Sequence, residues 1–316
     1  MLTRATTVKR SSPTKLALVD GDVLVYSSSF SAEKMLYELH LVEKDSVLEK
    51  PARSFQYKAD LDAYLINNGI EEYEVRKTLL VEPVEHALHN VKTMISSIKE
   101  KTNSTDMVIF LTGRGNFRKK VATYKEYKGN RVDSRVPQHK AAVTDYLVNF
   151  HKALVVDGQE ADDAMGIWQS SSEDNSTIIC SSDKDMLQIA GNHFRFGNNS
   201  WLMQDAESAD KHFFYQIMTG DSTDNISGCP GVGYKTAQKF YDPEIPWESV
   251  LLCYRTMLPK KPVDGLVYSQ DDDTLTYTPW NSSDSVTVSL RDFALEQAKL
   301  VRIRREENEY WEPHDR

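Results

Sequence analysis

Short apolar runs recur along the chain and alternate with stretches of helical periodicity. Four runs of four residues are almost wholly apolar: Leu16–Val19, Val108–Leu111, Ala153–Val156 and Thr177–Cys180. Continuous runs of this length are typical of strands buried on both faces of a parallel sheet. Between the first two runs, residues 84–100 repeat apolar positions every three or four residues, which indicates a helix. The alternation predicts an α/β fold with a mostly parallel central sheet flanked by helices.

Other segments do not continue this alternation. Residues 31–83 contain strand-like runs at 36–42, 54–58 and 73–81 with a helix near 59–67, and they predict an insertion beside the sheet. The later predicted elements are helices at 138–151 and from 162, a short helix at 183–190, a hairpin or edge strands at 194–196 and 201–203, a helix from 234, a β excursion within 264–289 and helical spacing over 290–305. The predicted organisation is a flexible tail (1–14), an α/β domain (15–205) and a helical region (206–316).

Composition restricts the class of protein. Forty per cent apolar and 27% charged residues describe an ordinary globular chain, and no apolar run approaches the ~20 residues that span a bilayer. Three scattered cysteines without a CxxC motif predict reduced thiols. Residues 1–15 are polar and basic without an apolar core, so we expect no secretory signal and a cytoplasmic location.

Acidic residues follow three of the four apolar runs. Asp20 and Asp22 follow the first run; Glu160, Asp162 and Asp163 follow the third; Asp183 and Asp185 follow the fourth. In an open α/β sheet the carboxyl ends of the strands border one crevice, so these side chains are predicted to meet there. Carboxylates so close together repel one another unless cations neutralise them, and hard oxygen ligands suit Mg²⁺ or Mn²⁺. Capping of a helix remains a simpler explanation of the acids at 160–163.

The net charge does not exclude a nucleic-acid partner. The formal charge is −9, and nine carboxylates belong to the candidate site once Asp221 and Asp224 are included, so the remaining surface is balanced. The basic and aromatic stretch 124–131 could contact phosphate and stack on a base, or could be a solvated loop. The glycine-rich segment 228–237 could present backbone N–H groups to a DNA phosphate, or could be a tight interhelical turn.

Five motifs occur in an order that identifies a family. They are VDGD (Val19–Asp22), YKGNR (Tyr127–Arg131), EADD (Glu160–Asp163), SSDKD (Ser181–Asp185) and GDSTDNISGCPGVGYKTA (Gly220–Ala237). Over residues 15–240 this pattern resembles the flap endonuclease and 5′→3′ exonuclease superfamily. The end of the chain, from Ala298 to Trp311, is similar to the T7-like phage 5′→3′ exonucleases, which implies a bacteriophage enzyme of DNA replication in the host cytoplasm.

The resemblance implies a role for individual residues. A first divalent ion would be held by Asp20, Glu160, Asp162 and Asp163, and a second by Asp183, Asp185, Asp221 and Asp224. Lys128, Arg131 and Asp163 would be catalytic. The DNA-binding residues would be Arg114, Arg118, Lys119, Tyr124, Tyr127, Lys128, Arg131, Gly231, Gly233, Lys235 and Thr236. The segment 220–241 would be a helix–three-turn–helix (helix–hairpin–helix) element of the kind that often binds a monovalent cation such as K⁺.

The implied activity is metal-dependent 5′→3′ DNA exonuclease action with flap endonuclease and RNase H-like character, on duplex DNA with a 5′ end or flap and on RNA–DNA hybrids. One departure matters, because family members usually carry a metal-site Asp where this chain has Gly113; Asp22 or a water would have to fill that place. Two alternatives stay open: a weakly active protein that binds DNA structures, and a PIN-type ribonuclease. Protein partners and the role of residues 31–83 are not indicated by the sequence.

Overall fold

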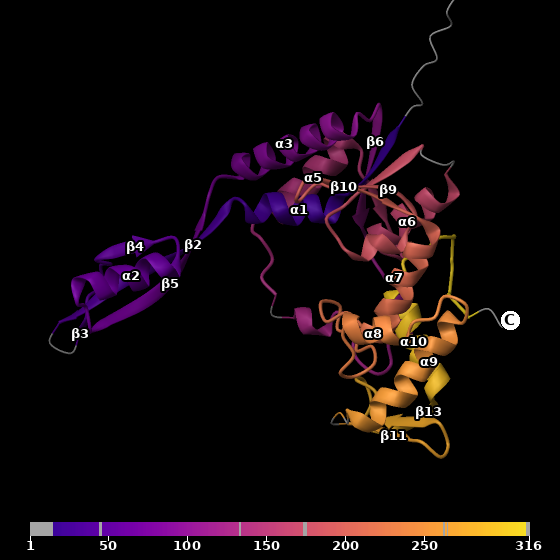
Figure 1. The fold of residues 1–316 in the computed structure, drawn as a ribbon. Coiled ribbons are helices and arrows are strands. Elements are labelled where there is room, and N and C mark those ends of the chain that lie inside the picture. The colour runs from indigo at the N-terminus through magenta and orange to yellow at the C-terminus, as the bar shows by residue number, and fades with distance from the viewer. Residues whose placement is uncertain are drawn as a thin grey trace, which may run out of the picture. The chain divides into compact units, whose positions relative to one another are not determined.

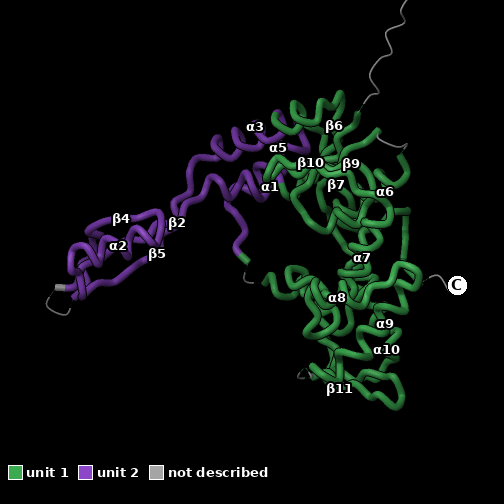
Figure 2. Tube along the Cα trace, in the orientation of Figure 1, with its two compact units in different colours: residues 1–23, 97–134, 151–316 green, residues 24–96, 135–150 purple. Residues whose placement is uncertain are grey.

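The computed structural model describes residues 15–43, 46–132, 134–172, 176–261, 263 and 265–313. The predicted flexible tail, residues 1–14, lies outside this range. The chain divides into two compact units, coloured separately in Figure 2. Unit 1 comprises residues 1–23, 97–134 and 151–316, and unit 2 comprises residues 24–96 and 135–150. Residues 206–316 therefore share a compact unit with the central sheet.

A six-stranded sheet forms the centre of unit 1 (Figure 1). Its strands are β1 (Leu16–Asp20), β6 (Asp106–Thr112), β7 (Leu154–Val156), β8 (Thr177–Cys180), β9 (Gly191–Arg195) and β10 (Ser200–Gln204). The spatial order is β10-β9-β8-β1-β6-β7, and only the β9–β10 pair is antiparallel. The four apolar runs are thus confirmed as neighbouring parallel strands, and 194–196 and 201–203 are confirmed as a terminal hairpin.

The apolar runs at the centre of the sheet form strands because their side chains are buried. Every residue of β8 is buried, as are the last four residues of β1. Helix α6 (Ala161–Ser171) packs Met165 against Leu18 and Ile179 of the sheet, and Ile303 from the segment after the last helix joins the same cluster. The carboxyl ends of β1, β6 and β8 therefore lie at one edge, above a packed core.

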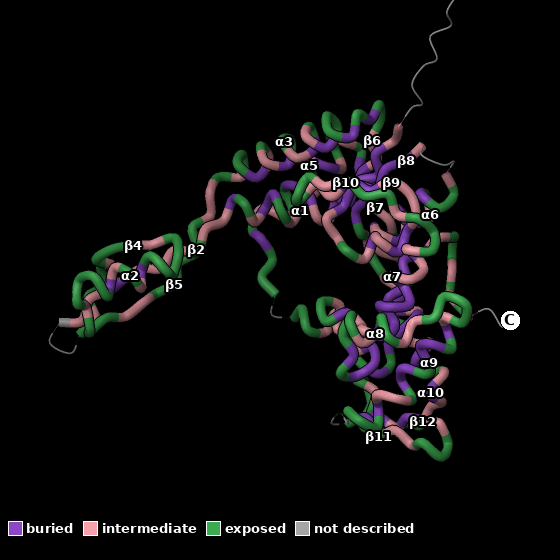
Figure 3. The backbone as a smooth tube through the Cα atoms, viewed as in Figure 1, coloured by how far each residue is buried: buried purple, intermediate pink, exposed green. Residues whose placement is uncertain are grey.

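The second half of unit 1 is mainly helical. Its elements are α7 (Ala206–Thr219), α8 (Tyr234–Phe240), α9 (Pro246–Met257), α10 (Leu290–Val301) and the small sheet β11 (Leu266–Ser269), β12 (Thr274–Tyr277) and β13 (Val286–Ser289). Figure 3 marks long buried stretches on α7 and α9, which together with α10 enclose an aromatic core around Phe213, Tyr254 and Phe293. Unit 1 also contains the short α-helix α4 (Arg118–Val121) and the 3₁₀ helices η1 (Gly129–Arg131), η2 (Asp185–Gln188) and η3 (Leu258–Lys260).

One predicted helix is too long. Residues 290–305 were expected to be helical, but α10 ends at Val301. The backbone leaves the helix because the N–H of Ile303 donates to the side chain of Gln188 instead of to a carbonyl one turn earlier. The residues after Val301 consequently leave the helix axis and pack against α6 and the central sheet through Ile303. They stay buried as far as Arg304.

Unit 2 contains the predicted insertion. Strand β2 (Glu33–Glu43) pairs with β3 (Ser46–Val47), β4 (Arg53–Phe55) and β5 (Tyr73–Val81), and α2 (Lys58–Asn68) covers this sheet through Leu61 and Leu65. The strand expected at 54–58 is shorter, since α2 already begins at Lys58. Helix α5 (Lys140–His151) and most of α1 (Gly21–Phe30) and α3 (Val84–Thr102) also belong to unit 2. Among the described helices of both units, none is long and apolar enough to cross a membrane.

Candidate active site

Acidic side chains from separate parts of unit 1 meet at the carboxyl edge of the sheet. Asp20 ends β1, and Asp183 and Asp185 follow β8. Asp162 lies in the first turn of α6, and its pKa is raised well above the usual range by burial and by the charges of Asp20 and Asp183. Carboxylates from distant parts of the sequence are thus close enough to repel one another.

Asp20 is the most enclosed acid of the sheet edge. It is 2% exposed and accepts hydrogen bonds from Ser181 Oγ at 2.6 Å and from the N–H of Val23 at 3.0 Å. Burial raises its pKa to about 6, the two hydrogen bonds work against this rise, and the charges of Asp22 and Asp183 add to it. The group is therefore held in place yet poorly stabilised as an anion.

Asp185 behaves in the same way. Burial, together with the charges of Asp183 and Asp221, raises its pKa to about 8. Its Oδ1 accepts a hydrogen bond from Gln216 Nε2 at 2.6 Å.

We call Asp20, Asp162 and Asp185 the raised-pKa acids. A divalent cation would relieve their mutual repulsion, and their hard oxygen donors fit Mg²⁺ or Mn²⁺. Among the residues that the structure describes, no three or more such side chains stand in an arrangement that could hold a metal ion as they are.

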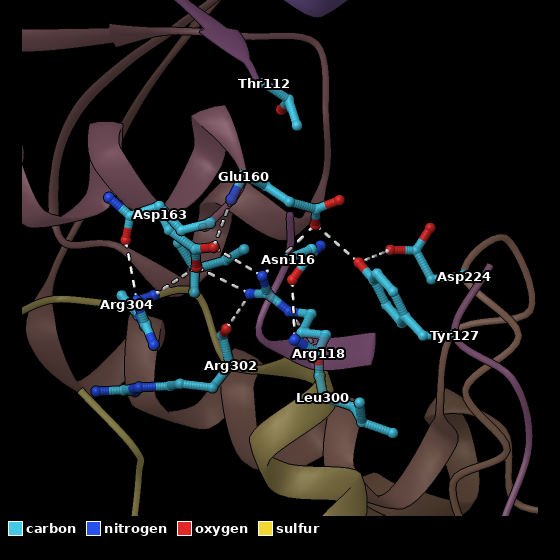
Figure 4. Close-up of polar contacts among 12 residues, drawn as sticks. Thr112, Asn116, Arg118, Tyr127, Glu160, Asp163, Asp224, Leu300, Arg302 and Arg304 are labelled. Atoms are coloured by element: carbon cyan, nitrogen blue, oxygen red, sulfur yellow. Dashed lines mark hydrogen bonds and ion pairs between the residues drawn. The ribbon is translucent and has the colours of Figure 1, made fainter. Parts of the chain in front are cut away.

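Asp163 has a different environment (Figure 4). It is fully buried, and Arg118 donates to its two oxygens at 2.7 and 2.8 Å. The N–H groups of Glu160 and Arg304 donate to the same carboxylate at 3.1 Å each. Burial alone would raise the pKa of Asp163, but the charge and hydrogen bonds of Arg118 outweigh it and lower the pKa. Both oxygens of Asp163 accept hydrogen bonds from protein donors in this structure, and its expected role in metal binding and catalysis stays a prediction.

Glu160 and Asp224 are also paired with cations. Lys128 donates to Glu160 and lies 3.6 Å from Asp224, and Arg131 donates to Asp224. Tyr127 joins the two acids through its hydroxyl, which lies 2.7 Å from an oxygen of each. Burial raises the pKa of Glu160, but Arg118 and Lys128 lower it by more. We call Glu160, Asp163 and Asp224 the cation-paired acids.

The glycine-rich segment folds into a tight turn next to these acids. Asp221 and Ile226 form an isolated β-bridge, and the N–H of Thr223 donates to Asp221 at 2.7 Å. Gly220 and Gly228 have positive φ values of 68° and 57°, and a side chain on either would collide with the backbone of the other turn. The close crossing of two backbones explains why both positions are glycine.

The predicted DNA-binding residues fall into two groups. Seven are at least partly accessible: Arg114, Lys119, Lys128, Arg131, Gly231, Gly233 and Lys235, with Thr236 half-buried beside them. The other three are buried. Arg118 is 1% exposed because it binds Asp163, Tyr124 packs its ring on Tyr277 and Phe293, and Tyr127 turns its hydroxyl to the acids. A nucleic acid cannot reach these three side chains in this conformation.

The position of Gly113 is filled by another acid. A side chain at Gly113 would collide with the carboxylate of Asp157, which accepts a hydrogen bond from the N–H of Arg114 at 2.5 Å. Asp22 also reaches this strand end, where the N–H of Thr112 donates to it at 3.2 Å. Two carboxylates therefore stand beside the position where the family pattern led us to expect one.

Sequence reasoning missed several residues that shape the site. Ser181 and Gln216 orient Asp20 and Asp185, and Arg118 orients Asp163. Ser181 could have been noticed because it directly follows the buried strand β8, before Asp183. Gln216 and Arg118 gave no local signal, since their partners lie 31 and 45 residues away in sequence.

Comparison with protein families gives a match for the middle of the chain. Residues 77–218 match the family described as 5′-3′ exonuclease, N-terminal resolvase-like domain. The 5′-3′ exonuclease of Buchnera aphidicola subsp. Acyrthosiphon pisum is 33% identical over 169 residues, which cover 48% of this chain and 58% of that protein. DNA polymerase I of Borreliella burgdorferi is 31% identical over 160 residues, which cover 46% of this chain and 18% of the polymerase. The chain thus spans less than two thirds of these curated relatives.

Solved structures of a phage nuclease are also similar, at low identity. The T5 D15 protein co-crystallized with metal ions is 14% identical, with a TM-score of 0.45, over 91% of this chain and 89% of that one. T5 5′-exonuclease with bound zinc ions is 15% identical, with a TM-score of 0.41, over 77% of this chain and 90% of that one.

Proposed function

We propose that this chain belongs to the 5′-3′ exonuclease family, whose model matches residues 77–218, and that it hydrolyses phosphodiester bonds at the 5′ ends of duplex DNA. The observation that carries this proposal is the convergence of Asp20, Asp162 and Asp185 at one sheet edge, with pKa values raised by burial and mutual repulsion. Bound cations would relieve the repulsion between these carboxylates. A purely structural role would not require acids to lie so close together.

Metal ions would be held by acids of this edge: Asp20, Asp162, Asp183, Asp185 and Asp221, with Glu160 and Asp224 at the border. Bound divalent ions supply activation of a water and stabilisation of the leaving oxygen in phosphodiester hydrolysis. The side chains of this chain would do the positioning. Ser181 fixes the carboxylate of Asp20, and Gln216 fixes that of Asp185, so that both face the same edge.

Lys128 and Arg131 would bind the scissile phosphate. Both cations already lie against carboxylates of the site, and Lys128 is only partly exposed. Their pairing with Glu160 and Asp224 holds them beside the acids before DNA arrives, and a phosphate would replace a carboxylate as the partner. Burial lowers the pKa of Lys128, but Glu160 and Asp224 raise it by more, so it stays charged.

The finer features of the activity extend this proposal. The turn 220–241 would grip the duplex backbone through accessible Gly231, Gly233 and Lys235, with K⁺ as a candidate cation there. The segment 114–137 is short for an arch that threads a long flap, so we favour exonucleolytic cleavage over strict flap cutting. RNA paired to DNA would also be a substrate, and a T7-like phage origin is consistent with these features.

A digestion assay tests the function. Duplex, 5′-flap and RNA–DNA hybrid substrates, labelled at either 5′ or 3′ ends, are incubated with the protein and Mg²⁺ or Mn²⁺. We expect short products from the 5′ label and a progressively shortened strand from the 3′ label. The matched pair of variants is Asp162→Asn, which removes a raised-pKa acid, and Asp106→Asn, which removes an exposed acid at the opposite end of β6.

The other outcomes separate the alternatives. A protein that binds DNA ends in EDTA and releases no nucleotide with either metal would be a DNA-structure binder. Cleavage confined to single-stranded RNA would indicate a ribonuclease of the PIN type. Equal activity of Asp162→Asn and wild type would refute the assigned site.

A further inference from the structure

The segment that follows α10 is bound to both groups of acids. We propose that Leu300–Arg304, which we call the brace, positions the active site, with Arg118 and Gln188 as the positioning residues that connect it to the acids. This inference deepens the proposed function, because it assigns a role in the same site to a segment far from every acidic motif.

Arg118 connects the brace to the cation-paired acids (Figure 4). Its guanidinium holds Asp163 with two hydrogen bonds. Its remaining donors reach the brace, where Nε donates to the carbonyl of Leu300 at 2.9 Å and Nη2 donates to the carbonyl of Arg302. The brace also contacts this carboxylate directly, because the N–H of Arg304 donates to Asp163 at 3.1 Å. One buried cation therefore fixes both the start of α6 and the brace.

Gln188 connects the brace to the raised-pKa acids. This side chain is fully buried, accepts from the N–H of Ile303 at 3.1 Å and donates to the carbonyl of Val301 at 2.6 Å. It also donates to Gln216 Oε1 at 2.6 Å, and Gln216 in turn donates to Asp185. A continuous line of hydrogen bonds thus runs from the brace backbone to an acid on the other side of the site.

A glycine in α6 makes the close approach of the brace possible. A side chain at Gly166 would collide with the carbonyl oxygen of Arg304 and would come within 2.9 Å of Ile303 Cγ2. Gly166 is an interior residue of α6, where glycine is unfavourable by about 1 kcal/mol relative to alanine. The contact with the brace gives a physical reason for that unfavourable residue.

The brace is buried along its length, including its two arginines. Arg302 and Arg304 are 8% and 5% exposed. Arg304 spreads its guanidinium over the ring of Phe117, 3.8 Å from the centroid, and donates to Gln159 at 3.1 Å. Gln159 directly precedes Glu160, so this bond adds a further connection between the brace and the acids.

Three single variants test the inference, and the first two of the three measurements need no DNA. Gly166→Ala pushes the brace off α6, Gln188→Leu removes its link to Gln216, and Arg118→Lys keeps the charge but removes the forked hydrogen bonds. Lys299→Met is the matched control, since Lys299 lies next to the brace and pairs only with exposed Glu312 among the contacts that the structure gives it. Release of the brace is measured as the rate of trypsin cleavage after Arg302 and Arg304, identified by mass spectrometry.

Positioning is measured separately as Mn²⁺ binding, from the free ion seen by electron paramagnetic resonance. We expect each variant to raise the cleavage rate about tenfold while circular dichroism stays native, and to weaken Mn²⁺ binding about 10-fold to 100-fold. On duplex DNA, kcat should fall about 100-fold with KM within twofold of wild type. Lys299→Met should behave as wild type in all three measurements.

Two results would overturn the inference. The first is a variant with a released brace and unchanged Mn²⁺ affinity and kcat, which would make the brace a passive part of the fold. The second is an unchanged trypsin rate in all three variants, which would show that these contacts do not hold the brace. If the wild type binds Mn²⁺ but cuts no DNA, the proposed function fails while the role of the brace is still decided by the first two measurements.

Discussion

Asp162 and Asp163 are neighbours in sequence, yet they belong to opposite halves of the site. The pKa of Asp162 is raised by burial among other acids, whereas the pKa of Asp163 is lowered by Arg118 against the effect of burial. Successive residues of a helix point about 100° apart, so the first turn of α6 presents one acid to the sheet edge and the other to the interior. On our proposal, the EADD motif supplies one carboxylate for the reaction and one for the fold.

The two groups of acids differ in what they give the protein. The cation-paired acids already have their counter-charges, from Arg118, Lys128 and Arg131, and contribute to the folded state as it stands. The raised-pKa acids repel one another and favour the folded state only when they are protonated or bound to cations. Stability and catalysis are thus assigned to different carboxylates within one site.

The largest effect should come from a raised-pKa acid. Replacing Asp162 with Asn keeps the shape but removes a charge that a divalent ion needs, so we expect kcat with Mg²⁺ to fall about a thousandfold. Initial rates on an end-labelled duplex measure the change, with Asp106→Asn as the matched control at full activity. If kcat falls less than threefold, Asp162 does not take part in the reaction.

Removing a counter-charge should instead damage the fold. In Arg118→Met the carboxylate of Asp163 stays buried without its partner, so the free energy of unfolding should fall by about 3 kcal/mol. Urea denaturation measures it, and Lys120→Met, an exposed position on the same short helix, should stay within about 0.5 kcal/mol of wild type. Equal stability of the two variants would mean that the Arg118–Asp163 pair is not structural.

Divalent ions should stabilise one half of the site. At about 100 times its Kd, a single bound ion adds about 2.7 kcal/mol to the free energy of unfolding. We therefore expect Mn²⁺ to raise the Tm of the metal-free protein, EDTA to reverse the rise and Asp162→Asn to remove most of it. If the Tm of the wild type does not change when Mn²⁺ is added, a metal site among these acids is contradicted.

The smallest effect is a pH dependence. Asp185 has a pKa raised to about 8, so its contribution to stability is complete below pH 4 and is lost as the pH rises towards 8. In EDTA, the wild type should lose about 1–2 kcal/mol more than Asp185→Asn between pH 5 and pH 8. The cation-paired Glu160 and Asp163 have lowered pKa values and lose their contribution only below pH 4. Parallel stability curves for the two proteins would show that Asp185 is an ordinary exposed acid.

The central sheet could be predicted from the sequence because its signal is local. Each of the four apolar runs forms a strand of the parallel sheet, although β7 at its edge is largely exposed, and acids follow three of the runs at the carboxyl ends of the strands. The parallel arrangement then places Asp20 next to the residues after β8 without any knowledge of side-chain contacts.

The partners of the acids could not be predicted in the same way. Arg118 stands in a basic stretch and was assigned to DNA binding, but its partners are Asp163 and backbone carbonyls 182 and 184 residues away. Tyr124 was also assigned to DNA binding, and the rings that enclose it come from β12 and α10, far away in sequence. Sequence patterns reveal residue type and spacing, whereas burial by distant segments depends on the tertiary fold.

The most direct test of the division between the two groups is a crystal soaked in Mn²⁺, with the ions located by anomalous scattering. We predict that Mn²⁺ is bound by oxygens of Asp20, Asp162 or Asp185, while Asp163 keeps both of its bonds to Arg118. Mn²⁺ coordinated by Asp163, or a sheet edge that binds no Mn²⁺ at saturating concentration, would contradict it.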